Sequence, residues 1–98
     1  MAFKIFITER AQTNIDDPVD YYEFKSENLG KRFYNDFLSN LKYIVKDPYL
    51  FAIREFPFRE YPLSTFPFLI IYDIVGDTVV IASVFNTAKN PRKKPTRL

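Results

Sequence analysis

The chain has 98 residues, 47% of them hydrophobic, which is enough for one core and too few for two domains. It contains no cysteine and no histidine, which excludes disulfides and thiolate metal sites and removes the commonest general base. The net charge of +2 is unevenly spread, because the last ten residues carry five lysines and arginines and no acid. We expect one domain over residues 1–88 without metal or cofactor. A basic tail over residues 89–98 then either meets an anionic partner or stays solvated.

Membrane insertion and secretion are not expected. The longest apolar runs are Phe66–Tyr72 and Val79–Phe85, far short of the roughly 20 residues that a membrane span needs. The first residues alternate in character and lack the continuous apolar segment of a secretion signal. The sequence therefore predicts a cytoplasmic protein without a membrane partner.

The chain opens with a predicted short strand over residues 3–8, followed by a helix over residues 9–27 that Thr8 can cap. The apolar residues of this helix recur at helical spacing: Ala11, Ile15, Val19 and Tyr22. Pro18 interrupts the stripe, because a proline inside a helix removes a hydrogen bond and clashes with the preceding turn. We expect a kinked helix, or two short pieces that meet near Asp16.

A second amphipathic helix is predicted over residues 28–46, where Asp47-Pro48 ends it. Its buried stripe has seven members: Leu29, Phe33, Phe37, Leu41 and Ile44, widened by Leu38 and Val45. The connection between the two helices is very short. Together they are expected to form an antiparallel helical hairpin.

The second half of the chain predicts strands. Ile53–Leu63 has strand character, but Pro57 and Pro62 cannot donate ladder hydrogen bonds, so this strand is expected at a sheet edge. Phe66–Val75 and Thr78–Phe85 are apolar on both alternating faces, which is typical of central strands. Glycine first in the two-residue loop between them favours a type II′ hairpin.

The order of predicted elements is β-α-α-β-β-β. It indicates an α+β two-layer sandwich, with the helical hairpin on one face of a mainly antiparallel sheet and the first strand paired with the last. The second face of the central strands is also apolar. Either a partner covers it, or side chains and the tail fold over it.

Five segments of the chain occur in a recognisable order: Ala11 to Ile15, Lys31-Arg32-Phe33, Asp47-Pro48, Phe66–Tyr72 and Val84–Pro91. Together they are similar to the RelE/ParE toxin superfamily. The resemblance covers nearly the whole chain and includes the order of elements. Its most distinctive part combines the FPFLIIY segment, the Gly-Asp turn and the closing Asn-Pro.

The resemblance implies the toxin half of a type II toxin–antitoxin pair, a growth inhibitor that a cognate antitoxin neutralises by wrapping it with an amphipathic segment. ParE-like members of the superfamily poison DNA gyrase, whereas RelE-like members cleave mRNA on the ribosome. Kinship with the superfamily leaves both targets open.

A metal-independent ribonuclease would need a base for the 2′-hydroxyl, a proton donor for the leaving oxygen and cations for the phosphorane. The candidates fall into two sets: the cations Arg54, Arg59, Lys89 and Arg92, and the proton donors Tyr61 and Tyr72. The set chosen for a ribonuclease is Arg59, Tyr61, Lys89 and Arg92. The alternatives are a surface salt bridge from Arg59 to Glu55 or Glu60, and core packing for Tyr72.

Two departures from the superfamily pattern favour the ParE-like branch. Leu69 stands where many relatives carry a basic residue, and Asn86 stands where many carry a histidine. Whether the chain is an enzyme stays open at this point. A third class is a non-toxic nucleic-acid-binding relative that uses the basic tail.

Overall fold

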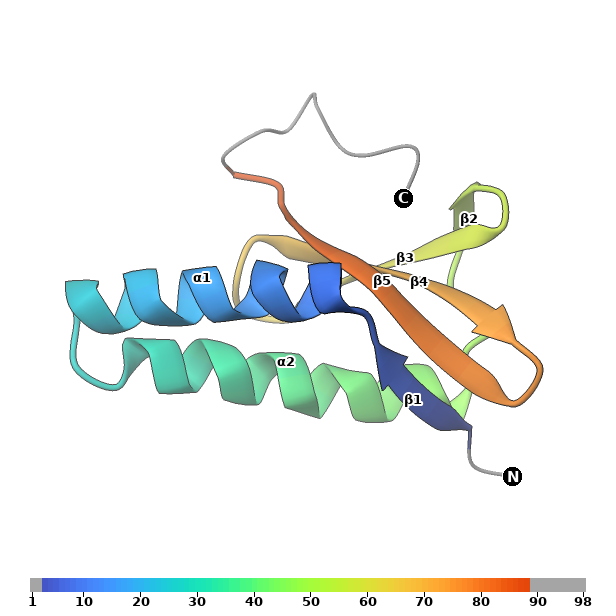
Figure 1. Cartoon of the computed structure of the whole chain (residues 1–98), viewed down its shortest axis with the longest axis horizontal. Helices are drawn as coiled ribbons and strands as arrows, with labels where there is room; N and C mark the ends of the chain where they lie inside the picture. Colours follow the sequence, from blue (N-terminus) through green and yellow to red (C-terminus); the bar gives the residue numbers. More distant parts are fainter. Residues whose placement is uncertain (1–2, 89–98) are drawn as a thin grey trace.

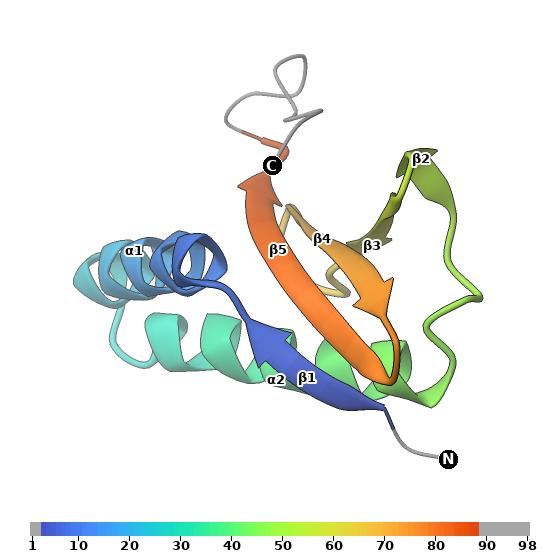
Figure 2. The same ribbon diagram turned by 45° about the vertical axis from the view of Figure 1, so that its right-hand side comes forward.

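The computed structural model of the chain describes residues 3–88 (Figure 1). The elements follow in the order β1 (Lys4–Ile7), α1 (Glu9–Lys25), α2 (Leu29–Lys46), β2 (Ile53–Glu55), β3 (Phe58–Pro62), β4 (Phe68–Val75) and β5 (Thr78–Asn86). The five strands form one sheet in the order β1-β5-β4-β3-β2, and both helices lie on one side of it (Figure 2). β1 runs parallel to β5 and the other neighbours are antiparallel. The predicted α+β sandwich and the pairing of the first strand with the last are confirmed.

Helix α1 begins where Thr8 caps it. The Thr8 hydroxyl oxygen accepts a hydrogen bond from the Ala11 N–H at 3.1 Å, as the sequence predicts. The helix then runs without a break through Pro18, so of the two expected alternatives a single helix is found and two separate pieces are not. Ile15 before the proline is fully buried, and Val19 after it packs against the same core. This burial on both sides offsets the lost helical hydrogen bond.

The N-terminus of α2 is capped by a residue of α1. Asn28 precedes the helix in a left-handed conformation, with φ of +68°, and its side chain makes no capping bond. The Glu23 carboxylate instead accepts hydrogen bonds from the N–H groups of Asn28 (2.8 Å) and Gly30 (3.0 Å). The first N–H groups of a helix have no partner within the helix, and Glu23 satisfies two of them. These bonds also tie the end of α1 to the start of α2.

The predicted edge strand over residues 53–63 is wrong in two respects. The segment forms two strands, β2 and β3, which turn at Phe56-Pro57, so the sheet gains a strand. β3 lies between β4 and β2, so of these two strands only β2 is at a sheet edge. The prolines permit this arrangement because Pro57 lies in the turn and Pro62 is the last residue of β3, where few ladder bonds remain to be donated.

The β4–β5 hairpin agrees with its prediction. Val75 pairs with Thr78, Gly76 has φ of +61°, and Asp77 is not among the described residues with positive φ, as a type II′ turn requires. On the inner face of β4, three side chains are buried against the helices: Phe68, Ile70 and Tyr72. On the outer face Ile71 is also buried, at 3% exposure. The outer face is therefore not a continuous exposed apolar patch.

The core is rich in aromatic rings. The Phe33 ring lies 4.8 Å from the Phe68 ring, 5.3 Å from Phe66 and 5.5 Å from Tyr22, measured between centroids. These tilted and edge-on contacts stabilise the packing of both helices on the end of β4. In α2 the predicted stripe is buried at four positions, whereas Leu38, expected to widen it, is exposed. No helix in the described part of the chain is long and apolar enough to cross a membrane.

The close contact of the two helices predicts a specific effect of replacing Gly30. A Cβ at this position would collide with the Val19 carbonyl oxygen and press on Glu23. We expect Gly30→Ala to lower the free energy of unfolding by about 2 kcal/mol, because backbone atoms must move. Gly76→Ala is the control: it meets no atom within 4 Å and should cost about 1 kcal/mol for its left-handed φ. Urea denaturation measures both, and a smaller loss for Gly30→Ala than for Gly76→Ala would contradict this account.

Candidate functional site

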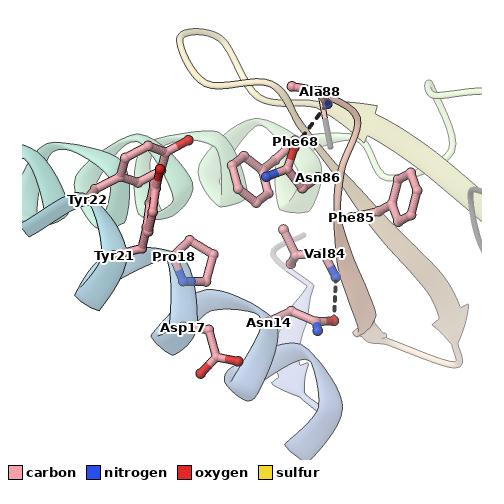
Figure 3. Close-up of a pocket in the computed structure, with 10 residues that line it drawn as sticks. All are labelled: Asn14, Asp17, Pro18, Tyr21, Tyr22, Phe68, Val84, Phe85, Asn86 and Ala88. Atoms are coloured by element: carbon pink, nitrogen blue, oxygen red, sulfur yellow. Dashed lines mark hydrogen bonds between the residues drawn. The ribbon is translucent and has the colours of Figure 1, made fainter. Parts of the chain in front are cut away.

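A pocket of about 610 Å³ lies between α1 and the end of β5 (Figure 3). Its lining comes from three segments: Asn14, Asp17, Pro18, Tyr21 and Tyr22 of α1, Phe68 of β4, and Val84, Phe85, Asn86 and Ala88 at the end of the described chain. Asp17 carries the only formal charge among these lining residues. The site is therefore largely apolar and aromatic, with a single carboxylate.

Two side chains at the start of α1 hold it against β5 and so define one wall of the pocket. The Thr8 hydroxyl lies 3.0 Å from the carbonyl oxygens of both Ile81 and Ala82. The Asn14 side-chain oxygen accepts a hydrogen bond from the Val84 N–H at 3.1 Å (Figure 3). These bonds fix the distance between helix and strand. This role of Asn14 was not predicted from the sequence, although a polar residue beside the apolar Ile15 was a usable signal.

Arg59 is placed on the helix-covered side of the sheet. It lies opposite Tyr72 in the β3–β4 register, and opposite residues share a face. Its Nη1 donates hydrogen bonds to the carbonyl oxygens of Phe51 (2.7 Å) and Tyr49 (3.2 Å), and its guanidinium lies over the Tyr49 ring. Arg59 thus anchors the connection between α2 and β2. Among the described residues neither salt bridge suggested for Arg59 is found, and Glu60 lies 3.8 Å from Arg54.

Tyr61 faces the same side and also has a bonded partner. Its hydroxyl donates to the side-chain oxygen of Asn40 at 2.6 Å, and Ser64 donates to the same oxygen at 3.0 Å. Asn40 is itself buried and donates to the Asp36 carbonyl. Burial, with smaller contributions from Tyr43 and Asp36, raises the pKa of Tyr61. A raised pKa makes this phenol a weaker proton donor near neutral pH.

Of the four candidate ribonuclease residues, the structure describes two and places them on one face of the sheet. Arg59 and Tyr61 share one face of β3, but they bind different partners, the α2–β2 connection and Asn40. Lys89 and Arg92 lie outside the described residues. Within residues 3–88, no three histidine, cysteine, aspartate or glutamate residues gather in a way that could hold a metal ion.

Tyr72 lies fully buried in the core and supports the same connection as Arg59. Its hydroxyl donates to the Pro48 carbonyl oxygen at 2.6 Å. Desolvation by burial raises the pKa of Tyr72 to about 12, a shift that nearby Arg59 opposes and Asp47 reinforces. The phenol of Tyr72 therefore stays neutral at physiological pH and acts as a structural hydrogen-bond donor.

The fold is that of RelE- and ParE-type toxins. A solved structure titled "Chromosomal ParDE TA system from P. aeruginosa" superposes with a TM-score of 0.70 at 19% identity, covering 87% of this chain and 96% of that one. A mutant of the E. coli toxin RelE in the free state gives 0.60 at 14% identity, covering 93% and 90%. A search of curated proteins finds no match.

The sequence itself matches the family model described as "ParE toxin of type II toxin-antitoxin system, parDE" over residues 5–91. The chain belongs to this ParE toxin family.

Removing the Tyr72 hydroxyl tests its structural role. We expect Tyr72→Phe to lower the free energy of unfolding by about 1–2 kcal/mol at pH 7, because the buried Pro48 carbonyl loses its partner. The pH dependence should change as well. The pKa of Tyr72 is 10.0 when unfolded and about 12 when folded, so its contribution is complete below pH 10 and is lost as the pH rises towards 12.

Denaturant unfolding of wild type and Tyr72→Phe between pH 7 and pH 12 measures both effects. The variant should lose less stability than wild type between pH 10 and 12. Tyr43→Phe, which alters an exposed tyrosine of α2, is the control and should follow wild type. Parallel curves for Tyr72→Phe and wild type would contradict the assignment.

Proposed function

We propose that this chain is the growth-inhibiting toxin of a type II toxin–antitoxin pair, that a cognate antitoxin binds and neutralises it, and that it acts on DNA gyrase in the manner of ParE. The family match over residues 5–91 supports the toxin function. The partner is proposed by analogy with the ParDE system that has the same fold.

The environment of Arg59 is the observation that favours gyrase over mRNA as the target. A cation that stabilises a transferring phosphate must point its N–H groups at the substrate. Arg59 directs its Nη1 at two main-chain carbonyl oxygens and stacks over Tyr49. Tyr61 is likewise bonded to Asn40. Both groups support the fold, and gyrase poisoning requires no catalytic residue of this chain.

The second candidate is a RelE-like ribosome-dependent mRNA endoribonuclease, which the likeness to the RelE fold favours. In that mechanism Arg59, Lys89 and Arg92 would stabilise the phosphorane and Tyr61 would donate the proton. The basic segment over residues 89–98 also suits a third candidate, a non-toxic nucleic-acid-binding relative.

Inducible expression in a bacterial host tests the proposal directly. We expect growth arrest when the chain is expressed alone, and relief of arrest when the small gene beside it is expressed too. Arrested cells should contain chromosome breaks and intact transcripts, because trapped gyrase leaves cut DNA. Cut transcripts without chromosome breaks would favour the ribonuclease, and the absence of arrest would favour the non-toxic relative.

Tyr61→Phe separates the two toxic mechanisms within the protein itself. Loss of one hydroxyl should destabilise the fold by about 1 kcal/mol through the Asn40 contact. We expect the variant to arrest growth as wild type does, because gyrase poisoning does not use the phenol. Tyr43→Phe provides the control for expression level. Retained folding, checked by circular dichroism, together with lost toxicity of Tyr61→Phe alone would instead support a catalytic phenol.

A further inference from the structure

The face of the sheet that points away from the helices carries a row of largely buried side chains. Glu60 of β3 lies opposite Ile71 of β4, and Ile71 lies opposite Ser83 of β5, so the three share this outer face. Ile71 and Ser83 are each 3% exposed, and the Glu60 side chain is 12% exposed. Both helices lie on the other side (Figure 2), so the sheet's own side chains or a further segment must shield this row.

The Ser83 hydroxyl in this row has no hydrogen-bond partner within residues 3–88. Buried polar side-chain atoms in folded proteins nearly always have a partner, because an unpaired one loses its hydration without compensation. A hydroxyl can both donate and accept a hydrogen bond. The outer face therefore offers a buried polar group that a further segment can bind.

A carboxylate on the same face is open to a cation. Asp73 of β4 lies two residues along the strand from the buried row, and so on the same side of the sheet. The strands also place two cations on this face, but Arg54 lies 3.8 Å from Glu60 and Lys4 lies 3.7 Å from Asp77. Within residues 3–88 no cation pairs with Asp73.

Apolar side chains surround these polar groups. Leu69 and Phe85 form the next pair towards the end of β5, and Val80 lies opposite Asp73. All three apolar side chains are half-buried. A segment that fits this face must therefore combine cations with aliphatic surface. Lysine and arginine do so, because their methylene stems lie on apolar surface while their charged ends reach carboxylates.

Residues 89–98 have this composition and a suitable length. They include five lysines and arginines and no acid. The chain enters them from the end of β5, where the Thr87 N–H and hydroxyl both bond to the Pro67 carbonyl oxygen, at 2.9 and 3.0 Å. Ten extended residues span up to about 33 Å. The 8 residues of β4 rise about 26 Å, so the segment can return along the sheet as far as Asp73.

We propose that residues 89–98 dock back onto the outer face of the sheet of the same chain. Lysines and arginines of the segment pair with Asp73 and lie beside Glu60, and a donor of the segment binds the Ser83 hydroxyl. The methylene stems of the same cations cover Ile71. The inference goes beyond the toxin function and does not depend on it.

Docking on this face separates the four candidate ribonuclease residues. Arg59 and Tyr61 lie on the helix-covered side of the sheet, bonded to the Phe51 carbonyl and to Asn40. A segment docked on the outer face keeps Lys89 and Arg92 on the opposite side. The four side chains then cannot converge on one phosphate.

Paramagnetic relaxation in the full-length chain tests where the segment lies. The sequence contains no cysteine, so Thr96→Cys provides a single site for a nitroxide label. Residues 96 and 80 are equally far along the chain from Ala88, so a segment that returns along β5 brings the label close to Val80. The label should broaden the methyl signals of Val80, on the outer face, more strongly than those of Val79, which is fully buried on the inner face.

Charge variants of Asp73 test the ion pairing. Asp73→Asn removes the charge but keeps a side-chain oxygen for the Ile74 N–H, which the carboxylate binds at 2.7 Å. It should lower the ratio of docked to undocked chains about two- to fivefold, the effect of losing one partly exposed ion pair. Asp73→Lys should lower this ratio further. Asp16→Asn is the matched control on α1, because it also keeps its acceptor, for the Gln12 amide, and should change nothing.

Salt provides a second measurement on the labelled chain. Raising the ionic strength from about 0.1 M to about 1 M shortens the screening length from about 10 Å to about 3 Å. The broadening at Val80 should weaken accordingly. Circular dichroism of every variant identifies any that fails to fold.

Three outcomes would overturn the docking. The first is equal broadening of Val79 and Val80, and the second is unchanged broadening at Val80 in folded Asp73→Lys. The third comes from mixing nitroxide-labelled chains with isotope-labelled chains that carry no nitroxide. Broadening transferred between chains would show that the segment docks on a second copy. These measurements do not use growth arrest, so failure of the docking and failure of the toxin function are distinguishable.

Discussion

The attachment of α1 to β5 is the constraint on which the arrangement of the molecule depends. The register between β4 and β5 shifts between Ile71, which pairs with Ser83, and Tyr72, which pairs with Ile81. Ala82 of β5 is therefore an extra residue at this point. Such bulges leave main-chain groups without ladder partners. Thr8 lies within hydrogen-bond distance of the Ala82 carbonyl, while it also caps α1. One threonine therefore fixes where the helix begins and where it meets the sheet.

The rest of the helical layer follows from that attachment. Once α1 is held along β5, its opposite side is available to α2, and Gly30 permits the close approach. Glu23 then caps the second helix, and Phe33 of α2 reaches the rings of Tyr22 and Phe68. The space left between α1 and the end of β5 is the pocket. The pocket is thus a product of how the layers pack.

Much of the fold was predictable because it depends on local patterns. The apolar stripes of the helices, the Thr8 cap and the turn at Gly76 are each encoded within a few residues. The division of residues 53–62 into two strands was not predictable, because one sequence alone does not show whether a proline lies within a strand or in a turn. Whether α1 would pass unbroken through Pro18 was left open for a similar reason: a local rule does not show how much tertiary burial will oppose it.

The candidate site was harder to predict because chemically capable side chains serve structure here. Arg59 and Tyr72 both donate hydrogen bonds to carbonyl oxygens of the connection between α2 and β2. These carbonyl oxygens need side-chain donors because the connection is neither helix nor strand. Sequence alone identifies a cation or a phenol but not the carbonyl that it will meet. Phe24 of α1 is the opposite case, because its side chain is 89% exposed and contributes little to the core.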